Sequence, residues 1–319
     1  MNTFKKIGLT ALASSLVVTS AYAGEMSVSG SASMGVKNNS GTATGKSWTM
    51  GNQLTFSGGG ELDNGLNVSL SFVLDQADDS TTGLANSPFD SHSLTISSDS
   101  MGTLVFAGEG GSTAIGGGAP LDLWDNGFSA TSPDRALPSN NMLKYTLPSI
   151  ADGFGAVVSY TPKSGTKMTE SDHAWNVSYT GIEGLSLSYG QGTDSGSGNA
   201  STDGQNGDQT KYSITYAYGP ITAMYTNSDY DGDLLSEDEE TTTYQLSYTV
   251  TENVSISYAQ EEHDEKNNTT DEEFDQISAS YTSGGMTLSV AQTNAENVAN
   301  SSDTSADMER WKLGASFAF

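Results

Sequence analysis

The feature that most constrains this chain is a two-residue alternation of apolar and polar side chains, which runs through almost all of it after residue 24. It is clearest in Met26–Val36, Leu66–Leu74 and Trp311–Phe319. Successive side chains of a β-strand point to opposite faces, so the pattern predicts strands with one apolar and one polar face. We find no comparable helical periodicity in this part of the sequence, and we therefore expect an all-β protein.

About sixteen such segments can be counted, and their connections alternate between short turns and long polar loops. A membrane β-barrel has short turns at one end and long loops at the other, whereas an exported soluble β-sandwich, the alternative, gives no reason for such sorting. We predict a transmembrane antiparallel barrel with strands near 25–37, 46–58, 64–76, 90–98, 102–108, 140–147, 154–161, 172–180, 184–191, 209–218, 220–228, 241–250, 252–261, 273–282, 285–293 and 309–319.

The first 23 residues differ from the rest of the chain. A positively charged start precedes the short apolar run Ile7–Val18, and Ala21–Ala23 has the small-x-small pattern of a cleavage site. This predicts a secretory signal peptide at 1–23, with an N-terminal anchor helix as the alternative, and a barrel domain at 24–319.

Composition excludes several classes of function. With 12 basic and 39 acidic residues the net charge is −27, which is incompatible with binding a nucleic-acid backbone. The chain has no cysteine, and its three histidines lack metal-ligand spacing. We therefore expect no catalytic residues, no nucleic-acid partner and no enzyme activity.

Two features favour the barrel over the sandwich. The chain ends on an aromatic residue, Phe319, inside a strand pattern. Tyrosines, which favour the lipid headgroup level, recur near predicted strand ends at Tyr160, Tyr179, Tyr189, Tyr218, Tyr225, Tyr248, Tyr258 and Tyr281.

Two motifs resemble Gram-negative general porins. The final segment, through Trp311, Phe317 and Phe319, is similar to the strand signal that the barrel-assembly machinery reads. Leu143–Phe154 resembles the sixth strand and following turn of the family, although it departs from the pattern by Leu147 before the proline and by the extra Asp152. The resemblance implies a sixteen-stranded outer-membrane barrel that usually trimerises and lets small hydrophilic solutes and ions diffuse passively.

The longest connection, 109–139, lies between the fifth and sixth predicted strands and spans 31 residues. Such long loops are usually functional or disordered. Leu121, Leu123 and Trp124 form an apolar cluster that a solvated loop would not need, so we expect this loop to fold into the lumen. Its position matches that of the porin constriction loop.

The charges of this loop predict the selectivity of the pore. The constriction residues would be Glu109, Asp122, Asp125, Asp134 and Arg135. The basic side chains expected on the opposing lumen wall are Lys37, Lys46, Lys144, Arg310 and Lys312, of which all except Lys144 would form one patch where the barrel closes. An acidic constriction concentrates cations, so we expect a cation preference.

Further expectations concern partners. The first five predicted strands lack tyrosine, and the apolar face of the first one is small, which favours contact with protein and hence a homotrimer. Asp229, Asp231 and Asp233 could bind Ca²⁺, and acidic loops could bridge to lipopolysaccharide through divalent ions. A substrate-specific channel, or a plugged structural or adhesion barrel without conductance, remains an alternative function.

Overall fold

The computed structural model describes most of the barrel but not every loop. The described residues are 26–39, 45–75, 89–116, 121–126, 128, 137–163, 170–195, 206–233, 238–303 and 306–319. The predicted signal peptide at 1–23 lies outside them, as do Asp134 and Arg135 of the long loop.

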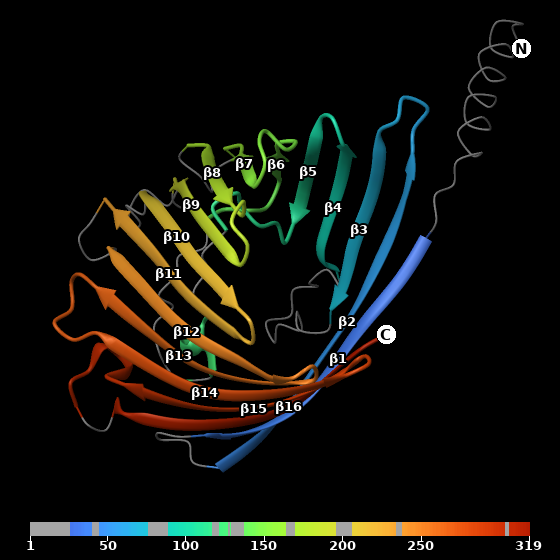
Figure 1. Cartoon of the computed structure of the whole chain (residues 1–319). Helices are drawn as coiled ribbons and strands as arrows, with labels where there is room; N and C mark the ends of the chain where they lie inside the picture. Colours follow the sequence, from blue (N-terminus) through green and yellow to red (C-terminus); the bar gives the residue numbers. More distant parts are fainter. Residues whose placement is uncertain are drawn as a thin grey trace, which may run out of the picture.

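Within these residues the chain forms a closed antiparallel barrel of sixteen strands, each paired with its neighbours in sequence (Figure 1). This confirms the predicted fold class and strand number. The strands are β1 (Met26–Asn39), β2 (Gly45–Glu61), β3 (Asn67–Asp75), β4 (Phe89–Ser98), β5 (Gly102–Glu109), β6 (Met142–Thr146), β7 (Phe154–Thr161), β8 (Asp172–Tyr179), β9 (Leu185–Asp194), β10 (Gly207–Tyr218), β11 (Ile221–Gly232), β12 (Glu239–Thr251), β13 (Val254–Glu265), β14 (Glu272–Ser283), β15 (Met286–Glu296) and β16 (Met308–Ala318).

The barrel closes where β1 pairs with β16. Phe319, the last residue, continues this pairing, because its N–H and C=O exchange hydrogen bonds of 2.9 and 2.7 Å with Gly30 of β1. A Cβ atom at position 30 would lie 2.5 Å from the Phe319 ring, so a larger residue there would have to displace the ring. The aromatic terminus is thus part of the closing seam.

The outer wall carries an apolar belt between two aromatic rows. Residues such as Ile277, which is 66% exposed, point away from the barrel and form this belt. The row near the short turns includes the Phe154–Tyr179 ring pair, and the row near the long loops includes Trp175–Tyr189 and Tyr225–Tyr244. This is the arrangement of a barrel whose outer face meets lipid, with aromatic rings at both interfaces.

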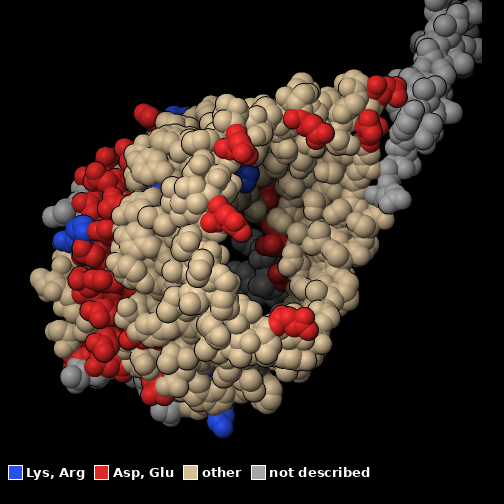
Figure 2. Space-filling model, viewed as in Figure 1, with Lys and Arg blue, Asp and Glu red and all other residues tan. Residues whose placement is uncertain are grey.

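Beyond the aromatic row on the long-loop side, the outer wall becomes acidic. The strand registers place ten carboxylates on the outward face of β10–β16, and we call this set the acidic band: Asp208, Asp229, Asp231, Glu240, Glu262, Asp264, Glu273, Asp275, Glu296 and Glu309. Figure 2 shows acidic side chains gathered along this side of the molecule. Since charged groups avoid hydrocarbon, the band marks the limit of the apolar belt.

Helical structure is minimal. The described residues contain the short 3₁₀ helices η2 (Leu123–Asn126) and η4 (Val298–Asn300). None of the described helices has the length and apolarity needed to cross a membrane.

Candidate functional site

The long connection between β5 and β6 turns into the barrel at its start. Lys144 of β6 donates from Nζ to the carbonyl oxygen of Ser112 at 2.8 Å, and the Ala114 N–H donates to Ser159 Oγ of β7 at 2.9 Å. Both ends of the loop reach the inner wall of β8, where one buried cluster contains Ala114, Ile115, Leu137 and Ala174.

The inner face of β9 has glycines where the loop crosses it. A Cβ atom at Gly190 would lie 3.2 Å from the carbonyl oxygen of Ile115, and one at Gly192 would lie 2.5 Å from the Leu137 side chain. Larger inward side chains at these positions would push the loop off the wall. The sequence of β9 therefore makes room for the loop.

The tip of the loop packs on a different part of the wall. Leu123 is only 3% exposed and joins a cluster with Phe128, Ala259, Phe274, Ala295 and Val298, against which Leu121 and Trp124 also pack. Phe128 belongs to the loop itself, and the other partners belong to β13–β15 and η4, so the loop runs from one side of the lumen to another. The short helix η2 is visible inside the barrel in Figure 1. The predicted packing of Leu121, Leu123 and Trp124 on the lumen wall is confirmed.

A hydrogen bond fixes the backbone of this tip. The Leu123 N–H donates to Glu261 Oε1 on β13 at 3.0 Å. Asp122, one residue earlier, has a positive φ of 53° and accepts a 3.4 Å hydrogen bond from Trp124 Nε1. The buried leucine and the bonded amide together hold the tip against the wall.

The predicted acidic constriction residues lie in different settings. Asp122 is exposed beside the docked tip, and Glu109 is exposed at the end of β5. Asp125 belongs to η2, although only its backbone is described. Figure 2 shows an opening into the barrel, with acidic side chains along its edge.

Three of the predicted basic residues share the inner face of the seam. Lys37 of β1 and Lys312 of β16 are direct register partners, and Arg310 lies two residues along β16. Arg310 extends over the Phe128 ring of the loop, with Cζ 5.1 Å from the ring centre. In the described part of the chain, no carboxylate lies within ion-pair distance of Lys37 or Lys312. The seam therefore presents positive charge to the lumen.

Two predicted lumen residues need correction. Lys46 pairs with Asn38 on the outward face, and its Nζ lies 5.8 Å over the ring of Trp311. Strand parity explains this, because Trp48 and Met50, at even spacing from Lys46, also point outward. Lys144 does point inward, but it binds the start of the loop instead of standing opposite it.

The proposed calcium ligands lie on the outer wall. Asp229 and Asp231 belong to the acidic band and Asp233 follows the end of β11. No group of three or more histidine or acidic residues in the described ranges is arranged to hold a metal ion. The calcium hypothesis remains a prediction without support from this geometry.

Sequence reasoning missed three charged residues on the inner wall: Glu261, His263 and Glu272. Their side chains are at most 3% exposed. The period-two spacing of Glu261 and His263 shows that they share a face, but only the register of β13 with β14 brings Glu272 beside His263.

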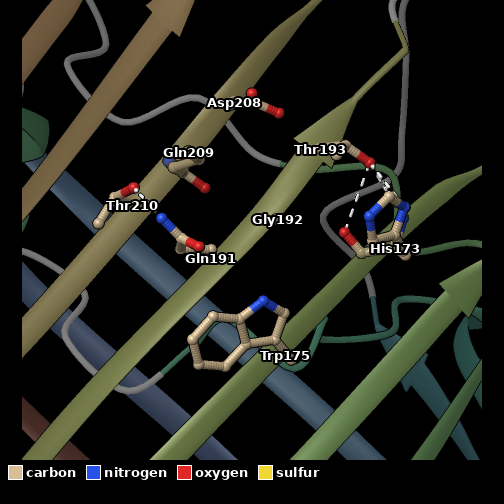
Figure 3. Close-up of a pocket in the computed structure, with 8 residues that line it drawn as sticks. All are labelled: His173, Trp175, Gln191, Gly192, Thr193, Asp208, Gln209 and Thr210. Atoms are coloured by element: carbon tan, nitrogen blue, oxygen red, sulfur yellow. Dashed lines mark hydrogen bonds between the residues drawn. The ribbon is translucent and has the colours of Figure 1, made fainter.

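A pocket of about 160 Å³ lies outside the lumen, on the outer wall of β8–β10 (Figure 3). It is lined by His173, Trp175, Gln191, Gly192, Thr193, Asp208, Gln209 and Thr210. Thr193 Oγ1 contacts Nδ1 and the carbonyl oxygen of His173, each at 3.4 Å. The pocket lies on the face of Trp175, so solutes crossing the lumen do not meet it.

A family model described as Gram-negative porin matches residues 8–282. No curated protein matches the chain in sequence. An anion-selective porin from Comamonas acidovorans has 15% identity and a TM-score of 0.65, with 93% of this chain and 100% of that chain covered.

Two other solved structures give the same picture. An engineered variant of the Rh. blastica porin has 15% identity and a TM-score of 0.65, with 92% of this chain and 100% of that chain covered. Salmonella typhi OmpF in complex with daunomycin has 11% identity and a TM-score of 0.66, with 93% and 98% covered. At these identities the likeness of the structures shows the fold.

Proposed function

The chain belongs to the Gram-negative porin family and is a porin of the bacterial outer membrane, and on this premise we propose that it forms a water-filled channel for passive diffusion of small hydrophilic solutes and ions, with a preference for cations. The observation that carries the proposal is the β5–β6 loop, which is docked inside the barrel by Leu123 and its neighbours. A loop in that place narrows the lumen and brings permeating solutes close to its charges.

The lumen wall opposite suits passive diffusion. The inward positions of β1–β4 carry mainly serine and threonine, such as Ser31, Thr55 and Ser71, together with Gln53. These groups are small and neutral, and each can exchange hydrogen bonds with water or a passing solute. These groups suit the passage of solutes without a chemical reaction, and we propose no cofactor.

The cation preference rests on the balance of charge at the narrowed part. Asp122 is exposed beside the docked tip, and the whole chain carries a net charge of −27. Lys37, Arg310 and Lys312 oppose this bias from the seam, so the acidic side must outweigh them for the proposal to hold. Because the Comamonas acidovorans relative is described as anion-selective, membership of the family does not decide the sign.

We also propose that the protein is a homotrimer. The most exposed apolar side chains of the outer wall include Trp48 at 78% and Met50 at 77%, both on β2. With Met26, Val28 and Met34 of β1 they form a wall without tyrosine. Because the apolar belt is exposed around the rest of the barrel as well, the lack of interfacial tyrosine is what distinguishes this wall, and a second copy of the chain is the occupant we propose.

Two further partners are part of the proposal. Trp311, Phe317 and Phe319 lie on the outward face of the last strand or at its end, where the barrel-assembly machinery could read them. The acidic band faces the polar part of the outer leaflet, where lipopolysaccharide is the expected neighbour.

The direct test is reconstitution in a planar bilayer with a salt gradient. We expect the conductance steps to come in groups of three, and we expect a reversal potential that indicates cation selectivity. Conductance with anion preference would refute the proposed selectivity and leave the channel standing. Correctly folded protein without conductance would refute the channel and favour a plugged barrel.

A further inference from the structure

Three charged side chains are buried together on the inner wall at the long-loop side of the barrel. They are Glu261 and His263 of β13 and Glu272 of β14, each at most 3% exposed. Burying charged groups is costly unless they are paired and hydrogen-bonded. These buried side chains are not among the residues that we expect to set the ion selectivity, so their burial has another explanation.

Each of the two ring nitrogens of His263 faces a carboxylate oxygen. Nε2 of His263 lies 3.1 Å from Glu261 Oε1, and Nδ1 lies 3.3 Å from Glu272 Oε2. An ionised carboxylate only accepts hydrogen bonds, so both ring nitrogens must donate. Only the imidazolium form carries a proton on both nitrogens. The ring also packs on Phe274, with 5.0 Å between ring centres.

Each carboxylate holds a different loop by its backbone. Glu261 accepts from the Leu123 N–H at the tip of the β5–β6 loop and from Thr243 Oγ1 at 3.2 Å. Glu272 Oε1 accepts from the Ala299 N–H at 2.5 Å, in η4 of the loop between β15 and β16. The bridging histidine therefore links the docking points of two loops that are far apart in sequence.

We propose that His263 is a positioning residue of the channel: as an imidazolium it bridges Glu261 and Glu272 and so holds the constriction-loop tip and the β15–β16 loop in one fixed arrangement. The proposal deepens the proposed channel function and rests on it. It predicts that brief closures of the open pore become more frequent when the imidazolium loses its proton.

The direction of the pH effect follows from the contacts of His263 with Glu261 and Glu272. A neutral imidazole has one N–H, so after deprotonation one ring nitrogen directs a lone pair at a carboxylate oxygen. That contact opens, and the carboxylate is left buried with fewer donors. Loss of one hydrogen bond to a charged group should lower the population of the docked state about tenfold or more.

Within the described residues, charged groups near the bridge come from β12, β16 and the loop. On β12, Thr241 pairs with His263, and the nearest charged group on that inner face is Glu239, two residues away. On the loop side, Asp122 adjoins Leu123, and Arg310 of β16 lies over Phe128. These groups set the local potential, but among the described residues the hydrogen bonds of the His263 ring go to Glu261 and Glu272.

The test is single-channel recording between about pH 6 and pH 9, a range that includes the usual titration of imidazole. In the unmodified protein we expect brief closures to become about tenfold more frequent as pH rises. In His263→Gln, whose amide can donate to only one carboxylate, closures should be frequent at every pH. His173→Gln, on the outer wall, is the matched control and should keep the unmodified pH profile.

A second pair of variants tests the carboxylates. Glu272→Gln should raise closure frequency, whereas Glu273→Gln, the outward neighbour on the same strand, should not. The chain has no cysteine, so a spin label on Leu121→Cys can report the loop tip, and its signal should sharpen as pH rises.

The outcomes separate the two proposals. Steady conductance with a flat pH profile in the unmodified protein, or a His263→Gln variant that behaves like His173→Gln, would overturn the bridge and leave the channel intact. Absence of conductance in all variants, with an immobile spin label at low pH and a mobile one at high pH, would support the bridge and refute the channel.

Discussion

Replacing Leu123 by alanine should release the tip of the constriction loop without weakening the barrel. Leu123 is 3% exposed and packs against residues of β13–β15. Removing a buried leucine side chain costs about 2–5 kcal/mol through lost burial and the cavity left behind. The barrel ladder does not depend on this side chain, so the cost should fall on docking of the loop. Since 1.4 kcal/mol is about tenfold, docking should weaken at least about 25-fold.

The assay is single-channel noise together with the size limit for sugars in liposome swelling. Leu246→Ala is the matched control, because it removes the same atoms from an outward position of β12. We expect noisier current and faster uptake of larger sugars in Leu123→Ala only, with heat-induced unfolding of the barrel unchanged. If Leu123→Ala matched Leu246→Ala in noise and sugar uptake, docking by this side chain would be refuted.

Three further predictions follow from the seam and the outer loops. Lys312→Glu changes the lumen charge by two units. At about 0.5 kcal/mol per charge across about 8 Å of water, this should favour a cation about fivefold and disfavour an anion about fivefold, so the cation-to-anion permeability ratio should rise about 30-fold. Lys46→Glu on the outer wall should leave the reversal potential unchanged. Gly30→Val should clash with the terminal phenyl ring and lower the yield of heat-resistant folded barrel, whereas Gly58→Ala, where a Cβ atom would meet its nearest neighbour at 3.6 Å, should fold normally. Lys266, beyond the end of β13, has its pKa raised from 10.5 by hydrogen bonds to the carboxylates of Asp264 and Glu240. The small stabilisation of the fold by this lysine should persist below pH 10.5 and disappear as the pH rises through the raised pKa. An NMR titration that found a lowered pKa for Lys266 would contradict the geometry.

The bounds of a strand could be predicted from the sequence where its outward residues belong to the apolar belt. The predicted strand 154–161 coincides with β7, because Phe154 and its alternate residues face lipid and so repeat an apolar signal. The predicted strand 220–228 ends too early, since β11 continues to Gly232. There the outward residues are Asp229 and Asp231 of the acidic band, where pairing with β10 and β12 continues although the apolar signal has stopped.

Only part of the candidate site could be predicted from the sequence. Leu121, Leu123 and Trp124 signalled by their composition that the loop packs on something apolar, and the structure shows the wall of β13–β15. Parity with Trp48 would have placed Lys46 outside, so this error was avoidable. The bridge through His263 could not be predicted from the sequence, because the register of the neighbouring strand brings Glu272 to the ring.

The sequence by itself determined which residues form strands and which face of each strand is apolar, because a period of two is a local property that each segment carries independently. Only the tertiary structure decided what meets inside the barrel. The pairing of Lys37 with Lys312, the docking of Leu123 and the bridge at His263 each join segments far apart in the chain. Their partners are set by strand register and by the closure of β1 on β16, which no local pattern encodes.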